Sequence, residues 1–182
     1  MKIVRKVLSE GKEDINCRAK KLNMTPLMTA TMVKHLYVVK LLVQRGADVL
    51  LVNKHGENTL LLSCQVGAVE ITKFYLSLNV FDINCRGRWN STPLMRAARY
   101  NQGEMVKFLV SKGADLSLVD GSGNNVLHTA CRSGDLATIK YLLSLNVLNI
   151  DARNRSGRTA AKIAKFRKKQ DLVDFLKFQG AQ

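Results

Sequence analysis

The chain has 182 residues and a formal net charge of +15, from 29 Lys and Arg against 14 Asp and Glu. Hydrophobic residues make up 46% of it, which is ordinary for a folded domain, and no apolar run approaches the roughly 20 residues of a membrane-spanning helix. These features exclude a helical membrane span and favour acidic partners: an acidic protein surface, nucleic acid or anionic lipid.

Residues 1–13 contain apolar side chains at helical spacing, namely Ile3, Val4, Val7 and Leu8. The segment is typical of the second helix of a helical pair that lacks its first half. Two explanations remain open. It is either a short amino-terminal cap whose basic residues form a polar outer face, or the remainder of a longer array from which the chain has been cut.

The remaining chain repeats one unit five times. Each copy begins with a residue that can cap a helix, continues with apolar residues at helical spacing, breaks, and then has a second apolar stretch. The capping residues recur at intervals of 33, 34, 33 and 34 residues, at Thr25, Asn58, Thr92, Asn125 and Thr159. A fixed period of this length is typical of a stacked array in which no unit buries its core alone.

The six residues that start each copy share a pattern: T-P-L-M-T-A at 25–30, N-T-L-L-L-S at 58–63, T-P-L-M-R-A at 92–97, N-V-L-H-T-A at 125–130 and T-A-A-K-I-A at 159–164. They resemble the T-P-L-H-x-A signature of ankyrin repeats, and residues 82–115 match the whole unit most closely. The resemblance covers nearly the whole chain. It implies an all-α solenoid of helix-turn-helix units joined by β-turn fingers.

We therefore expect a single ankyrin-repeat domain over residues 1–182. It would comprise the amino-terminal half repeat or cap at 1–13 and five repeats at 14–46, 47–80, 81–113, 114–147 and 148–182. The repeats alternate between two types, since Asp-Ile-Asn-Cys-Arg occurs at 14–18 and again at 82–86. This alternation indicates that the array grew by duplication of pairs.

Four cysteines occupy two kinds of place in the repeats, with Cys17 matched to Cys85 and Cys64 matched to Cys131. Each matched pair is two repeats apart, and packed helices lie about 8–10 Å apart, so each pair is separated by roughly 16–20 Å. A disulfide needs Cα atoms within about 7 Å. Neither matched pair can bridge. Both places usually hold alanine in ankyrin repeats, so the resemblance implies that the four thiols are buried and reduced. They fit a reducing compartment, and the basic amino end lacks the apolar core of a signal peptide, so we place the protein in the cytoplasm or, alternatively, the nucleus.

No catalytic, metal or cofactor site is expected. The Gly121-Ser122-Gly123 stretch lacks the spacing of a phosphate-binding loop, and no Cys-x-x-Cys or Cys-His spacing indicates a metal site. His128 occupies the place of the signature histidine, which the resemblance implies is a brace for the turn. No nucleophile is placed beside any histidine, so we predict a protein that is not an enzyme and that needs no cofactor.

The resemblance implies that partners bind the concave surface, which the turn tips and first helices form. On that surface we predict a protein-binding site of Arg88, Trp89, Arg99, Tyr100, Arg132, Arg155 and Arg158, with the first five at its centre. Trp89 is the only tryptophan and falls at a turn tip, and tryptophan, tyrosine and arginine are the types most enriched in interface hot spots. The alternative is that Trp89 packs sideways on the neighbouring turn and binds nothing.

The sequence therefore predicts a monomeric, non-enzymatic scaffold that binds an acidic, partly apolar segment of a protein partner. Two alternatives remain: nucleic-acid binding through phosphates, for which the chain has the charge but no further motif, and a substrate adaptor within a larger complex. The basic fifth repeat, with Arg-Lys-Lys at 167–169, has three interpretations: an end cap, an extension of the concave surface, or part of a nuclear-import signal.

Overall fold

The computed structural model describes residues 14–182, and the half repeat or cap expected over residues 1–13 lies outside the described residues. Within 14–182 the chain forms five successive helical pairs: α2 (Pro26–Met32) and α3 (Leu36–Gln44), α4 (Thr59–Val66) and α5 (Val69–Ser77), α6 (Pro93–Arg99) and α7 (Gly103–Ser111), α8 (Val126–Ser133) and α9 (Leu136–Ser144), α10 (Ala160–Phe166) and α11 (Gln170–Phe178). One further turn of 3₁₀ helix, η1, covers Arg88–Asn90. No strand occurs in this part of the chain, which confirms the predicted all-α solenoid.

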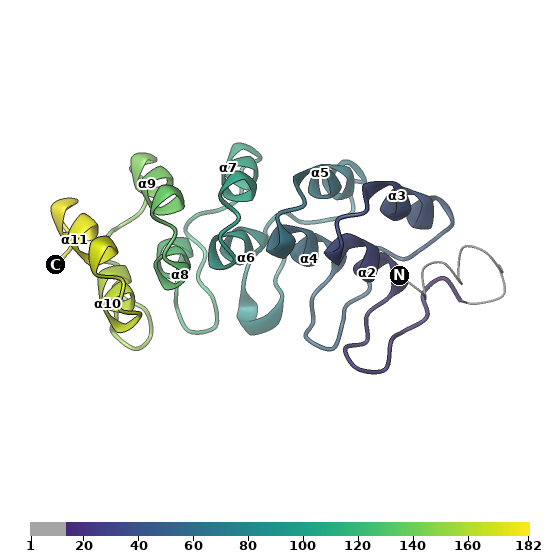
Figure 1. Cartoon of the computed structure of the whole chain (residues 1–182), viewed down its shortest axis with the longest axis horizontal. Coiled ribbons are helices and arrows are strands. Elements are labelled where there is room, and N and C mark those ends of the chain that lie inside the picture. The colour runs from purple at the N-terminus through teal and green to yellow at the C-terminus, as the bar shows by residue number, and fades with distance from the viewer. Residues whose placement is uncertain (1–13) are drawn as a thin grey trace.

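The pairs stack side by side along one axis (Figure 1). The first helices, α2, α4, α6, α8 and α10, form one row, and the second helices form a row above them in this view. The turns between pairs extend as loops below the row of first helices. Each helix packs on its own partner, the first helices pack on one another along the whole row, and α3, α5, α7 and α9 pack in the same way, so the array is held by contacts between neighbouring repeats.

Helix starts follow the expected capping chemistry. In every first helix, the side-chain oxygen of the capping residue accepts a hydrogen bond from the backbone N–H three residues later, at Thr25, Asn58, Thr92, Asn125 and Thr159. Each such cap contributes about 1 kcal/mol because it satisfies a donor that the helix leaves free. Two first helices also begin with proline, whose missing N–H costs nothing at that position.

The core runs continuously through the stack between the two rows of helices. The signature leucines Leu27, Leu60, Leu94 and Leu127 are at most 2% exposed, and they join one cluster of buried residues that extends to Leu176. Burying one leucine side chain stabilises the fold by about 1.5–3 kcal/mol relative to leaving it exposed. The apolar face predicted from the spacing is therefore the face that packs.

The four cysteines are unbridged in the structure. Cys64 and Cys131 are buried, and burial raises the pKa of each thiol to about 12. Cys17 and Cys85 are only half-buried, so the expectation that all four thiols are buried was wrong for these two. The reason is their place in the turn segments before the first helices, at the edge of the core.

Boundaries between repeats differ in their polar links. The first repeat is joined to the second by Asn16 Oδ1, which accepts from the backbone N–H of Asp48 at 2.9 Å, and by Arg18 Nη1, which donates to the carbonyl of Val52 at 2.7 Å. The third repeat is joined to the fourth in the same way, by Asn84 to Asp115 at 3.0 Å and by Arg86 to Val119 at 2.9 Å. We call this pair of hydrogen bonds the Asn–Arg link.

The second and fourth repeats lack the side chains for this link. Leu50 and Val52 stand in the places of Asn84 and Arg86, and in the fourth repeat Ser117 and Val119 stand there. Other polar contacts join the fourth repeat to the fifth, among them Asn154 Nδ2 to Asn124 Oδ1 at 2.7 Å. The alternation seen in the sequence therefore corresponds to two different ways of joining neighbouring repeats.

Candidate partner-binding site

Two cavities lie between the turn tips and the first helices. The first, which we call the tryptophan pocket, has a volume of about 250 Å³ and draws its lining from the first three repeats. Its lining includes Met24, Glu57, Arg88, Trp89, Arg96 and Tyr100. The second, which we call the arginine pocket, has a volume of about 200 Å³ and draws its lining from the last three repeats, including Ser122, Ser156 and the arginines Arg99, Arg132, Arg158 and Arg167.

The turn of the third repeat differs from the others. In the second, fourth and fifth repeats the turn begins with Asn53, Asp120 or Asn154, whose side-chain oxygen accepts backbone N–H bonds from two and four residues later. The third repeat has Gly87 at this place, so the brace is missing. The next residues instead form η1, where Trp89 has a left-handed φ of 57°.

This conformation puts the tryptophan side chain on the surface. Trp89 is 52% exposed. Two guanidinium groups lie over its ring, with the guanidinium carbon of Arg88 4.1 Å and that of Arg99 5.1 Å from the ring centroid. Its backbone carbonyl accepts from Gly121 N–H of the next turn at 2.7 Å. A left-handed residue other than glycine costs roughly 1–2 kcal/mol, so the fold holds Trp89 in place against a local preference.

The floor of the tryptophan pocket holds a buried ion pair between Glu57 of the second repeat and Arg96 of the third. Arg96 is 2% exposed and Glu57 is 6% exposed, and Asn53 Nδ2 donates to the same carboxylate at 3.1 Å. The Arg96 guanidinium also lies 5.9 Å from the ring of Tyr100. The charge of Arg96 is therefore neutralised inside the protein and is not offered to a partner.

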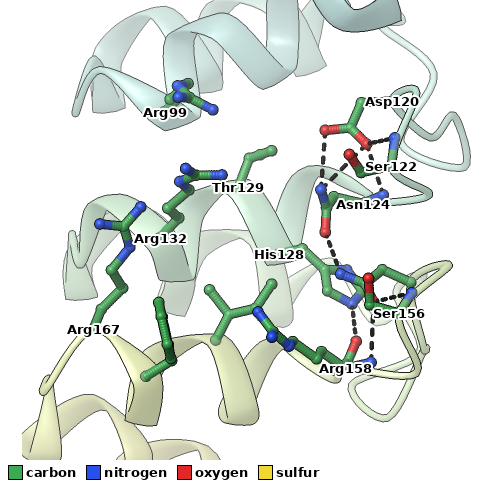
Figure 2. Close-up of a pocket in the computed structure, with 13 residues that line it drawn as sticks. Arg99, Asp120, Ser122, Asn124, His128, Thr129, Arg132, Ser156, Arg158 and Arg167 are labelled. Atoms are coloured by element: carbon green, nitrogen blue, oxygen red, sulfur yellow. Dashed lines mark hydrogen bonds between the residues drawn. The ribbon is translucent and has the colours of Figure 1, made fainter.

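The arginine pocket has the opposite character. Arg99, Arg132 and Arg167 come from the carboxyl-terminal ends of three successive first helices, and they lie along one side of the cavity (Figure 2). Arg158 comes from the turn of the fifth repeat, with its guanidinium carbon 5.3 Å from the centre of the Phe166 ring. None of these four arginines forms an ion pair with another residue in the range 14–182.

The single carboxylate that lines the arginine pocket is already occupied. Asp120 accepts hydrogen bonds from the backbone N–H of Ser122 at 2.8 Å and of Asn124 at 2.9 Å, and from the Asn124 side-chain amide (Figure 2). Burial lowers the pKa of Arg132, and repulsion from Arg99 and Arg167 lowers it further. The cavity therefore carries positive charge that the surrounding protein does not balance.

His128 supports the wall of this pocket. Its Nδ1 lies 2.6 Å from Asn125 Oδ1. Its Nε2 lies 3.0 Å from the carbonyl oxygen of Arg158 in the next turn (Figure 2). Burial lowers the pKa of His128, which favours the neutral ring. The histidine therefore braces the turn that carries Arg158, as expected from its place in the signature.

Residues 34–120 and 95–182 each match the family model of ankyrin repeats in three copies. The chain belongs to the ankyrin-repeat family. Ankyrin repeats are typically non-enzymatic and generally mediate protein–protein interaction. Among residues 14–182 no group of three or more His, Cys, Asp or Glu side chains is placed to hold a metal ion, and no helix there is long and apolar enough to cross a membrane.

Parts of several known proteins are similar in sequence to this chain. The chain is 30% identical to alpha-latrocrustotoxin-Lt1a of Latrodectus tredecimguttatus over 84% of this chain and 10% of that protein. It is 30% identical to the B-cell lymphoma 3 protein homolog of Mus musculus over 88% of this chain and 36% of that protein. The nuclear factor NF-kappa-B p105 subunit of Rattus norvegicus is 34% identical over 63% of this chain and 12% of that protein. The similarity thus concerns only part of each relative.

The predicted binding residues fall into both pockets of the ankyrin array. Arg88, Trp89 and Tyr100 line the tryptophan pocket, whereas Arg99, Arg132 and Arg158 line the arginine pocket. Arg99 connects the two pockets, because it lines the second and contacts the ring of Trp89 from the first. Arg155 lines neither and donates to the carbonyl of Gly121 at 2.6 Å. The structure thus has two adjoining pockets where we expected one centre.

Arg96 and Phe166 were not among the binding residues predicted from the sequence, although each lines one of the pockets. Arg96 had a detectable signal, because the equivalent places in the other repeats hold Thr29, Leu62, Thr129 and Ile163. A charged residue in that series requires a partner, and Glu57 stands one place before the cap of the preceding repeat. Arg167 belongs to the basic run of the fifth repeat, for which an extension of the concave surface was one of the three interpretations.

Proposed function

We propose that this ankyrin array is a non-enzymatic scaffold that holds an acidic, partly apolar segment of a protein partner along its turn tips and first helices. The observation that supports this most directly is Trp89, a half-exposed ring between two guanidinium groups at the junction of two pockets. Exposed tryptophan is a frequent anchor in interfaces, and guanidinium groups bind carboxylates in a paired geometry.

The two pockets suggest which parts of the segment go where. The tryptophan pocket has apolar lining from Leu22, Met24 and Met32 beside Trp89, and its arginine is paired with Glu57, so it suits an apolar side chain. The arginine pocket suits acidic groups because none of its four arginines forms an ion pair with another residue of 14–182. We infer that the partner segment carries an apolar residue next to acidic ones.

The test is the affinity of a captured partner for matched variants. After capture from cell lysate and identification, the dissociation constant is measured for the wild type, Trp89→Ala and Lys162→Ala. Lys162 is exposed and lines neither pocket, so its loss removes charge only. Truncation of a true anchor costs about 2 kcal/mol or more, or roughly 30-fold in affinity, and a rim lysine costs far less. Equal, small losses in both variants would contradict the proposal.

Two alternatives use the same charge in other ways. Nucleic-acid binding is favoured by the net charge of +15, and it predicts steep, sequence-independent salt dependence with unrelated duplexes. The proposed scaffold shows a shallower salt dependence, because part of its binding energy is apolar. A substrate adaptor within a larger complex is a narrower form of the proposed function. We further propose that the protein acts as a monomer in the cytoplasm or nucleus.

A further inference from the structure

We propose that the arginine pocket binds the phosphoryl group of a phosphorylated serine or threonine in the partner segment. The inference rests on the proposed function for the surrounding peptide, whereas the pocket for the phosphoryl group stands on its own geometry. Arg99, Arg132, Arg158 and Arg167 supply the positive charge of this pocket.

The amount of charge favours a dianion over a carboxylate. The four guanidinium groups line one cavity of about 200 Å³, and none is in an ion pair within the described part of the chain. Asp120 is engaged by its own turn through Ser122 and Asn124. A side-chain carboxylate brings one negative charge, whereas a phosphoryl group brings about −1.5 to −2 and three acceptor oxygens. Arginine pairs such oxygens through two parallel N–H bonds.

The donors approach the cavity from the first helices and from a turn. Three arginines extend from the ends of α6, α8 and α10, and Arg158 extends from the turn of the fifth repeat (Figure 2). The hydroxyl groups of Ser122 and Ser156 also line the cavity, and neither forms a hydrogen bond among the described residues. The volume admits several water-sized groups, since a cavity needs only about 10–15 Å³ to hold one water. A phosphoryl group therefore meets donors on more than one side.

A purely structural role, in which the arginines stabilise the ends of their helices, explains only part of this arrangement of arginines. Cations at carboxyl-terminal helix ends are stabilised by the helix dipole, which accounts for the positions of Arg99, Arg132 and Arg167. It does not account for Arg158, which lies in a turn with Phe166 against its guanidinium, or for the two unused hydroxyl groups. The site is recessed between the turn tips and the first helices. A peptide can enter such a site, whereas the flat surface of a membrane cannot.

The experiment titrates the full chain with blocked phosphoserine, in which the amino and carboxyl groups are capped as amides. Side-chain Nε–H signals of arginine are followed by nitrogen-15 NMR. We expect saturable shifts for Arg132 and Arg167, and an affinity at least about tenfold higher than for equally blocked aspartate. Arg132→Gln and Arg167→Gln each weaken binding about tenfold, and Arg132→Lys retains part of it because lysine keeps the charge without the paired geometry.

Lys165→Gln is the matched control, since Lys165 is exposed on α10 and does not line the pocket. It removes the same unit of charge and leaves the affinity for blocked phosphoserine unchanged. Thermal melts of each variant verify folding, which is expected because Arg132 and Arg167 are both exposed. Equal weakening in all three glutamine variants would mean a diffuse charge effect and would overturn the proposal, as would the absence of saturation.

Two further arms separate the explanations. In the first, binding to vesicles that contain a phosphoinositide is measured by co-sedimentation. If the protein binds these vesicles through Arg132 but does not bind blocked phosphoserine, the ligand is a lipid headgroup and the phosphopeptide proposal is refuted. Trp89→Ala is expected to weaken the binding of blocked phosphoserine less than Arg132→Gln does, because it removes only the ring that Arg99 contacts and leaves all four guanidinium groups in place. If Trp89→Ala binds the partner as the wild type does, the proposed anchor fails while the phosphoryl site stands. If Trp89→Ala loses the partner but the wild type does not bind blocked phosphoserine, the phosphoryl site fails while the anchor stands.

Discussion

The tryptophan pocket and the arginine pocket both lie between turn tips and first helices, in the first three and the last three repeats respectively, yet their arginines are held in opposite ways. In the first, Arg96 is buried and paired with Glu57; in the second, Arg132 faces the cavity and forms no ion pair within the part of the chain that the structure describes. The two arginines stand at different places of the repeat: Arg96 is four positions after its cap, where stacking brings it to Glu57 of the preceding repeat, whereas Arg132 is seven positions after its cap, at the end of its helix. The place of an arginine in its repeat therefore decides whether a pocket offers its charge to a partner.

The largest effect is expected from breaking the buried pair. Glu57→Gln leaves the Arg96 guanidinium buried without a counter-charge, so the free energy of unfolding should fall by about 3–5 kcal/mol. Urea unfolding measures it. A double variant, Glu57→Leu with Arg96→Met, should recover most of this loss because it removes both charges together.

The control for that comparison is an exposed pair in the same array. Glu104 and Lys107 are joined at 2.9 Å on α7, and both side chains are more than half exposed. Glu104→Gln should change the free energy of unfolding by less than about 1 kcal/mol. Similar losses at Glu57 and Glu104 would show that burial does not distinguish the two pairs.

A smaller, pH-dependent effect is expected beneath the arginine pocket. Burial lowers the pKa of His128 below its ordinary value of 6.5, so the unfolded chain binds a proton more readily than the folded one. The stability that neutral His128 provides is therefore complete above that ordinary value, and it is lost as the pH falls from there through the lower pKa of the folded state. The free energy of unfolding measured between pH 8 and pH 5 should decline, and His128→Gln should flatten the decline relative to His55→Gln. An unchanged slope would contradict this.

The smallest effect is expected at the arginine without an ion pair. Arg132→Gln should alter the free energy of unfolding by less than about 0.5 kcal/mol, since the side chain is exposed and the loss of a helix-end cation is offset by relief of repulsion from Arg99 and Arg167. Urea unfolding of Arg132→Gln beside Arg96→Met makes the comparison direct. A loss of several kcal/mol at Arg132 would show that it, too, has a structural role.

Much of the fold follows from local sequence chemistry. The caps at Thr92 and Asn125 and the buried positions of Leu94 and Leu127 were predicted because each depends on residues a few places away. The exposed tip position of Trp89 was predicted for the same reason.

Contacts between repeats were harder to predict. Glu57 and Arg96 are 39 positions apart (96 − 57) and meet only because neighbouring repeats stack. The division of one expected site into two pockets has the same origin, since Arg99 lies beside Trp89 and Arg132 faces Arg167 only after the first helices are aligned. The left-handed turn at Trp89 likewise reflects the absence of a side-chain brace at Gly87, which matters only in comparison with Asn53 and Asp120.

The Asn–Arg link has a consequence for engineering arrays of this kind. Its donor and acceptor side chains belong to one repeat, but the groups they bind, the N–H of Asp115 and the carbonyl of Val119, belong to the backbone. Every repeat supplies such backbone groups, so the link can be moved to a boundary that lacks it. Ser117→Asn with Val119→Arg would install it between the fourth and fifth repeats, each new hydrogen bond contributing about 0.5–1.5 kcal/mol. Two substitutions per boundary would then tune the rigidity of the array without touching either pocket.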